Sequence, residues 1–247
     1  MKFDAFNPTL PYRKRKPRSS KMIFLAMEGS VTEEEYVKIL MNTYSSVASR
    51  IKLLSVIDDI VQIPPEDRSA DQHRIITSSD PKHMVQRLDN FKKEKEFEYD
   101  LSKHIDDEYW IVVDIDDHLI ESKIDAWNDV ISDCNSKGYK YAVSNPFFEL
   151  YILLHFDDVN ENDESYAVTL TNSYKVTSHF RDRVNLIHHV FTRKKHLDSS
   201  FFNDANIRQA ISRAEQMHLN KTDYVPMYLC STFYRIVNLI IELVDTN

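Results

Sequence analysis

The chain has 247 residues, which is enough for one sizeable α/β domain or for a domain of about 150 residues with a helical extension. Hydrophobic residues make up 42% and charged residues 28%, and no apolar run approaches the roughly 20 residues that span a bilayer, so we expect an ordinary globular protein without membrane spans. The two cysteines and two glycines exclude a zinc knuckle, a disulfide framework, a Walker A loop and a GxGxxG fingerprint, and the formal net charge of -8 argues against a general nucleic-acid coating protein.

The first 20 residues form a basic arm. No apolar segment followed by a small-residue cleavage site is present, so we expect no secretory signal and a cytoplasmic location. Such an arm can neutralise the phosphates of a nucleic acid, although a solvated tail explains the same composition. The candidate nucleic-acid-binding residues are Arg13, Lys14, Arg15, Lys16, Arg18 and Lys21. The basic residues of the segment 193–196, with Arg181 and Arg183, are candidates for a second rim of a groove.

The first structural unit after the arm reads as strand, acidic turn and helix. The continuous apolar run Met22–Met27 predicts a strand that is buried on both faces of a parallel sheet. The strand ends at Glu28–Gly29. Thr32 and Glu35 then have the spacing of a capping box, and apolar residues at helical spacing follow them.

The middle of the chain continues this alternation. We predict further strands at 51–57, 109–113 and 140–144 and a long loop from 58 to 79. One helix is predicted to begin at Asp80–Pro81 and to run toward His104, and a second to pass through Trp127 and to end at Gly138. Strands that alternate with helices indicate βαβ units and a parallel sheet. The predicted fold is therefore α/β, with a parallel sheet flanked by helices in residues 21–156.

The last part of the chain, residues 157–247, reads as a mainly helical region. An apolar helix is predicted just before it, over 147–156, and the strongest helical segments within it are 207–217 and 228–244. The segment 165–203 gives no clear pattern.

Acidic residues stand where two of the predicted strands end. Glu28 follows the first strand, and Asp114 and Asp116 follow the third. Ligands bind beyond the carboxyl ends of parallel strands, and residues two apart in a strand project to the same face, so one cation can reach both aspartates. Mg²⁺ prefers such oxygen ligands, and one or two carboxylates suffice to hold it. The competing interpretations are acids that merely solvate a loop, and the DxD of haloacid-dehalogenase-type phosphatases, in which Asp114 would be the nucleophile.

Five further residues are weaker candidates. Asp117 is either a second-metal ligand or a side chain that points away from the aspartate pair. Glu33 lies in the first turn of a helix, where an acid also has a structural role. Glu149 is an acid in an apolar segment, where it must be paired or used. Asn145 before Pro146 is typical of a turn that caps a helix, and His155 among apolar residues is typical of a hydrogen-bonded core histidine.

Three motifs in this order resemble the RloB-like family. They are EGSVTEEEY at 28–36, VVDIDD at 112–117 and SNPFFELYILLHF at 144–156. The resemblance covers most of the chain and is strongest from about residue 13 to residue 156. It implies a Toprim-type fold in residues 21–156.

The resemblance also implies an activity and a context. In such a protein Glu28, Asp114 and Asp116 bind Mg²⁺ or Mn²⁺, and the glutamate acts as general acid/base or as a further ligand. Family members are presumed effector nucleases of bacterial or archaeal anti-phage abortive-infection systems and are encoded beside an ATPase. The expected function is therefore metal-dependent cleavage of DNA or RNA, with tRNA among the candidate substrates. The alternatives are a metal-binding subunit that senses or regulates without catalysis, and a haloacid-dehalogenase-like phosphotransferase.

Overall fold

The computed structural model describes Arg18 and residues 20–29, 31–54, 80–115, 121–159, 173–193, 195–218 and 228–246, without the side chains of residues 121–124, 173–178, 193 and 218. Several predictions lie outside the described residues: the loop at 58–79, most of the basic arm, and the aspartates Asp116 and Asp117.

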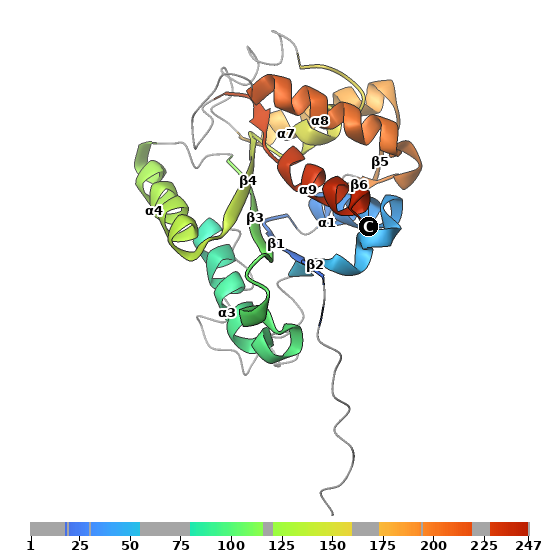
Figure 1. The fold of residues 1–247 in the computed structure, drawn as a ribbon. Coiled ribbons are helices and arrows are strands. Elements are labelled where there is room, and N and C mark those ends of the chain that lie inside the picture. Colours follow the sequence, from blue (N-terminus) through green and yellow to red (C-terminus); the bar gives the residue numbers. More distant parts are fainter. Residues whose placement is uncertain are drawn as a thin grey trace, which may run out of the picture.

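A mostly parallel sheet forms the centre of the molecule (Figure 1). Within the described residues it has five strands in the order β2-β1-β3-β4-β7. The strands are β1 (Ile23–Met27), β2 (Ile51–Leu54), β3 (Glu108–Asp114), β4 (Lys140–Asn145) and β7 (Cys230–Ser231). The first four are parallel, and β7 pairs antiparallel with β4. The predicted α/β class is confirmed.

Helices cover both faces of this sheet (Figure 1). The helices in the described residues are α1 (Thr32–Thr43), α3 (Pro81–Tyr99), α4 (Glu121–Lys137), α5 (Glu149–Leu153), α7 (Ser173–Ile187), α8 (Asp204–His218) and α9 (Tyr234–Asp245). Short 3-10 helices occur at η1 (Ser45–Arg50), η3 (Leu101–Lys103) and η4 (Ser199–Phe201). A separate two-stranded hairpin consists of β5 (Phe191–Arg193) and β6 (His196–Leu197).

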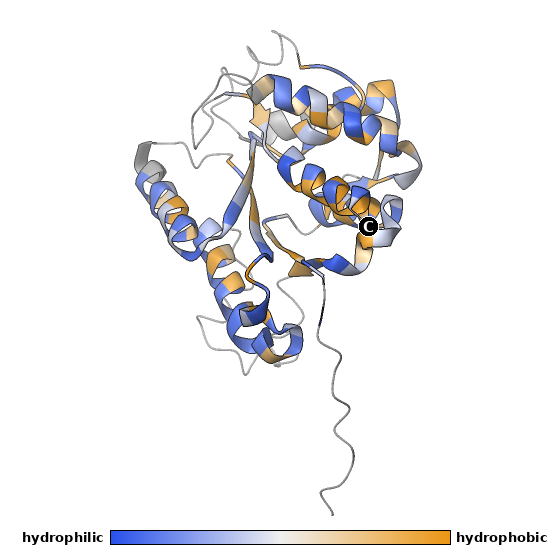
Figure 2. Ribbon diagram, viewed as in Figure 1, coloured by the Kyte–Doolittle hydropathy of each residue, from blue (hydrophilic) through white to orange (hydrophobic). Residues whose placement is uncertain are grey.

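Two hydrophobic cores lie on opposite faces of the sheet, because successive side chains of a strand point to opposite sides. Phe24 and Ala26 of β1 pack in the core beneath α3 and α4. Ile23, Leu25 and Met27 pack in the larger core beneath α1, α5, α7, α8 and α9. All five residues of β1 are buried, which explains its continuous apolar sequence; Figure 2 shows apolar residues in both the strands and the helices around them.

The two helices on the smaller core have the ends that the sequence predicts. Asp80 caps α3, since its carboxylate accepts a hydrogen bond of 2.9 Å from the amide of Lys82, and Pro81 occupies the first helical position. Gly138 follows α4 with a φ of 70°, a left-handed conformation that glycine adopts without strain.

The C-terminal region belongs to the same core as the sheet. In its described part it is mainly helical, as predicted, but the predicted helix at 228–244 begins only at Tyr234 because Cys230 and Ser231 form strand β7. Helix α9 shares the larger core with β1 and α1. The division at residue 156 therefore separates parts of the chain that fold around one sheet. In the described residues, none of the helices combines the length and apolar character needed to cross a membrane.

Candidate functional site

Glu28 and Asp114 meet at the carboxyl-terminal edge of the sheet. Strands β1 and β3 are neighbours, and the amide of Glu28 continues their ladder with a hydrogen bond of 3.0 Å to the carbonyl of Val112. The Glu28 carboxylate then accepts a hydrogen bond of 3.1 Å from the amide of Asp114. The acid that ends the first strand is thus fixed against the acid that ends the third, as the sequence predicted.

Asp114 faces the layer of helices that includes α1. Its neighbour Ile115 is 1% exposed and packs in the core on the other side, and the amide of Ile115 donates to the carbonyl of Ser144 in β4 at 2.8 Å. Because strand side chains alternate, Asp114 points away from α3 and α4. The placement of Asp116 and Asp117 stays a prediction. Among the described residues, no group of three or more histidines, cysteines and acids is arranged to hold a metal.

Glu33 is buried against the turn that follows Glu28. Its carboxylate lies so close to Gly29 that a Cβ atom at position 29 would overlap it, so any larger residue there would displace the Glu33 carboxylate. The pKa of Glu33 is raised to about 7 by burial, with a further contribution from the negative charge of Glu149, while the Lys195 charge lowers it.

Glu149 connects this buried acid to the C-terminal region. It is the first residue of α5 and is 5% exposed. Arg181 of α7 donates to its carboxylate at 2.7 Å. Glu149, for which the sequence allowed a structural or a functional role, therefore has a cationic partner. The core beneath α1 thus contains two acids, Glu33 and Glu149, close to the edge that carries Asp114.

The first turn of α1 does not form the predicted capping box. The residue before the helix is Val31, and no side chain caps the helix end. Thr32 instead donates to the carbonyl of Lys195 at 2.9 Å. Glu35 accepts from the amide of Leu197 at 2.8 Å and contacts Nδ1 of His196 at 2.5 Å. Both side chains that fitted the capping pattern hold the β5–β6 hairpin, because an acceptor for Thr32 and donors for Glu35 from residues 195–197 lie within their reach.

Arg87 of α3 is a residue of this edge that the sequence did not single out. Its guanidinium donates to the carbonyl of Met27, the residue before Glu28, at 3.4 Å, and it is attracted by the charge of Glu28. Burial nevertheless lowers the pKa of Arg87. Arg87 lies three residues after Met84 and four before Phe91, both of which are buried. Its position beside the apolar stripe of α3 is the sequence signal that could have identified it.

Two other candidates have structural partners. Asn145 ends β4 opposite Cys230 and is followed by a cis peptide bond to Pro146; it does not cap a helix, since α5 begins at Glu149. His155 is 1% exposed, contacts the hydroxyl of Tyr36 at 2.7 Å and the carbonyl of Tyr151 at 3.0 Å. Burial lowers the pKa of His155 to about 3, so the ring is neutral, and Nδ1 must donate to the Tyr151 carbonyl.

Arg18 and Lys21 lie at the opposite edge of the sheet. Arg18 pairs with the fully buried Asp107 at 2.5 Å, and Lys21 pairs with Glu108 at 2.8 Å. Glu108 begins β3, and Asp114 ends it six residues later, so the two edges are separated by about 20 Å at roughly 3.3 Å per residue. Arg18 and Lys21, the described residues of the basic arm, therefore do not lie beside Glu28 and Asp114, and nucleic-acid binding by the arm stays a prediction.

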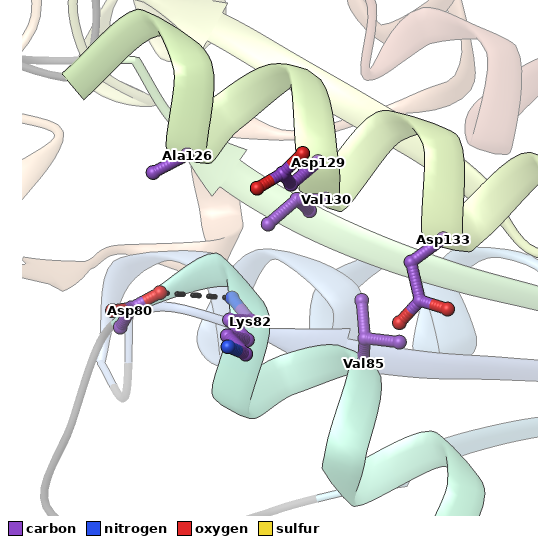
Figure 3. Close-up of a pocket in the computed structure, with 7 residues that line it drawn as sticks. All are labelled: Asp80, Lys82, Val85, Ala126, Asp129, Val130 and Asp133. Carbon is purple, nitrogen blue, oxygen red and sulfur yellow. Dashed lines mark hydrogen bonds between the residues drawn. The ribbon is translucent and has the colours of Figure 1, made fainter.

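A cavity of about 280 Å³ lies between α3 and α4. Figure 3 shows Asp129 and Asp133 of α4 and Asp80, the cap of α3, around it. Its lining residues are Asp80, Lys82, Val85, Ala126, Asp129, Val130 and Asp133. Neither Glu28 nor Asp114 lines this cavity, so it is separate from the candidate metal centre.

Comparison with known proteins gives one family. The model of the family described as RloB-like protein matches residues 23–240, which is most of the chain. No curated protein and no solved structure matches the chain.

Proposed function

Because the chain belongs to the RloB-like protein family, we propose that it is a metal-dependent nuclease that cleaves phosphodiester bonds of DNA or RNA. The observation that carries this proposal is the hydrogen bond from the Asp114 amide to the Glu28 carboxylate. It holds acids of two parallel strands at the edge of the sheet where ligands of open α/β folds bind.

The residues of this edge suit a hard divalent cation such as Mg²⁺ or Mn²⁺. Asp114, with Asp116 two residues later in sequence, would supply carboxylate oxygens, and such ions need few protein ligands because they retain water. A bound ion of this kind activates water and neutralises charge on a phosphodiester. Glu28 is fixed by a backbone donor, so it can accept or return a proton from one defined position, or serve as a further ligand.

The biological part of the proposal rests on the family resemblance. We infer an effector of bacterial anti-phage abortive infection that works with an ATPase encoded nearby. The chain itself has two glycines and no Walker A sequence, so ATP hydrolysis is assigned to that partner.

The test is a cleavage assay with the full chain, alone and with the neighbouring ATPase. Substrates are tRNA, single-stranded DNA and duplex DNA, each in Mg²⁺, in Mn²⁺ and with EDTA. We expect cleavage that EDTA abolishes, and a loss of at least about 100-fold in Glu28→Gln and Asp114→Asn, the scale for removing a catalytic acid/base. Glu34→Gln is the matched control, since Glu34 makes a pair with Lys38 on the outer part of α1.

Two results would contradict the proposal. If the wild-type chain with its partner cuts none of these substrates in either metal, it is not a nuclease of this kind. If Mn²⁺ binds but Asp114→Asn still protects cells against phage, the acids hold a structural ion, as in a regulatory subunit without catalysis.

A further inference from the structure

The hairpin β5–β6 contains the densest run of cationic residues after the N-terminal arm. Its sequence from 193 to 196 is RKKH, in a chain whose formal net charge is -8. The backbone of β5 pairs with β6 through Phe191 with Leu197 and Arg193 with His196, so the described residues Arg193, Lys195 and His196 lie at the tip of the hairpin. The side chain of Lys195 is exposed there.

Three hydrogen bonds or polar contacts fasten this tip to the first turn of α1. Thr32 binds the Lys195 carbonyl, while Glu35 holds the Leu197 amide and the His196 ring. Thr32 comes four residues after Glu28, so their Cα atoms are at most about 14 Å apart at roughly 3.6 Å per residue. The tip of the hairpin is therefore held at the carboxyl-terminal edge of the sheet, and Figure 1 shows β6 next to α1.

The electrostatics of this edge call for cations in that place. Glu28 and Asp114 lie at this edge, and a polyanion that approaches their carboxylates is repelled. Lys195 is close enough for its charge to act on the buried Glu33 carboxylate. Arg18 and Lys21, by contrast, are engaged in ion pairs at the other edge. Arg87 and Arg181 bind Met27 and Glu149 there, and the hairpin adds the exposed cation Lys195 to them.

We propose that the tip of the β5–β6 hairpin, with Lys195 at its centre, binds the phosphate backbone of a nucleic-acid strand and guides it to the edge that carries Glu28 and Asp114. This inference rests on the proposed nuclease function and names the surface that takes the substrate. Lysines bind phosphates as point charges without reading the sequence, so the contact is independent of base identity and sensitive to salt.

The experiment measures nucleic-acid binding separately from cleavage. Fluorescence anisotropy of a labelled single-stranded DNA and of a labelled tRNA is followed with the full chain in EDTA, over about 50 to 200 mM salt. For Lys195→Ala we expect weaker binding and a slope of log Kd against log salt that falls by about 0.7 on the single strand, the value for one lost phosphate contact. The combined Arg193→Ala, Lys194→Ala and Lys195→Ala variant should lose about two units or more, and Lys195→Arg should retain the wild-type slope.

Lys103→Ala is the matched control, because Lys103 is a 70% exposed lysine of η3 near the amino-terminal edge. It removes the same charge and should leave the slope unchanged. If the triple variant binds with the wild-type slope, the hairpin inference is wrong, whether or not the chain cleaves. If binding depends on the hairpin but the wild type with its partner cleaves nothing, the nuclease proposal fails and the hairpin inference stands.

Discussion

At the amino-terminal edge of the sheet each acid faces a base, whereas at the carboxyl-terminal edge acids predominate. The amino-terminal edge joins Asp107 to Arg18 at 2.5 Å and places Glu108 between Lys21 at 2.8 Å and Lys140 at 2.6 Å. The two lysines lower the pKa of Glu108 against the opposing effect of burial. The charges at this edge are neutralised within the protein, and their ion pairs stabilise the fold.

The carboxyl-terminal edge is arranged differently. Glu28 is held by the backbone amide of Asp114, a donor that fixes the carboxylate without removing its charge. Glu33 and Glu149 are buried nearby, and Arg181 binds Glu149. Arg87 adds one attraction for Glu28 from the other face. The amino-terminal edge is thus neutralised by its own ion pairs, whereas the carboxyl-terminal edge carries the acids of the proposed metal site, and four predictions can break or sharpen this contrast.

The largest effect should come from the amino-terminal edge. Asp107 is fully buried, binds Arg18 through both oxygens and accepts a hydrogen bond of 2.9 Å from the Met22 amide. Asp107→Asn leaves Arg18 without its anion, so we expect a loss of about 3–5 kcal/mol in the free energy of unfolding, measured by urea denaturation. Cleavage per folded molecule should be unchanged. If Asp107→Asn were as stable as wild type, or folded but inactive, the assignment of stability to the amino-terminal edge and of cleavage to the other edge would be contradicted.

Glu33 should make the stability of the protein depend on pH. Its pKa is 4.5 in the reference state and about 7 in the fold, so between these values the folded chain holds a proton that the unfolded chain has released. Stability therefore falls as the pH rises through this window, by up to about 3 kcal/mol. Glu33→Gln removes this loss and should be more stable than wild type at pH 8 but not at pH 4. Equal differences from wild type at both pH values would show that Glu33 is ionised in the fold.

A divalent ion should distinguish the two edges directly. At about 100 times its dissociation constant, Mn²⁺ should stabilise the wild-type chain by about 2.7 kcal/mol, seen as a rise in melting temperature. Asp107→Asn should gain the same increment, because its change lies at the other edge, whereas Asp114→Asn should gain almost none. An equal rise in Asp114→Asn would place the ion elsewhere.

The smallest effect should come from the partly exposed end of the amino-terminal network. Lys140 is 52% exposed where it pairs with Glu108, and Lys21 also binds that acid. For Lys140→Met we expect a loss below about 1 kcal/mol, since solvent screens exposed pairs, and this loss should shrink further in high salt. Urea denaturation at low and high salt measures it. A larger, salt-independent loss would mean that Lys140 contributes through packing.

Local patterns predicted much of this molecule. The apolar run before Glu28, the aromatic and β-branched run before Asp114, and the Asp80–Pro81 start of α3 all specify their elements through short-range physics. The alternation of strands and helices then requires a parallel sheet, and with it the meeting of Glu28 and Asp114 at one edge.

Other features depended on contacts between distant segments. The Thr32 and Glu35 pattern fits a helix cap, yet both side chains instead make polar contacts with residues 195–197. Cys230 and Ser231 lie in an apolar stretch that helical periodicity does not distinguish from α9, and pairing with β4 makes them a strand.

The sequence by itself determined the parallel sheet and the two acids at its edge, because burial patterns and strand ends are local properties of the chain. Only the tertiary structure decided which charges lie near those acids. Arg18 and Lys21 precede Glu28 closely in sequence but lie at the far edge. Arg87 and Lys195 are distant in sequence, yet Arg87 binds the carbonyl of Met27 and Lys195 is held by Thr32 near the edge that carries Glu28. The two ends of a strand such as β3 are about 20 Å apart, so residues close in sequence can lie at opposite edges of the sheet. Helices and hairpins bring distant segments back to one edge, and sequence proximity therefore does not predict electrostatic partners.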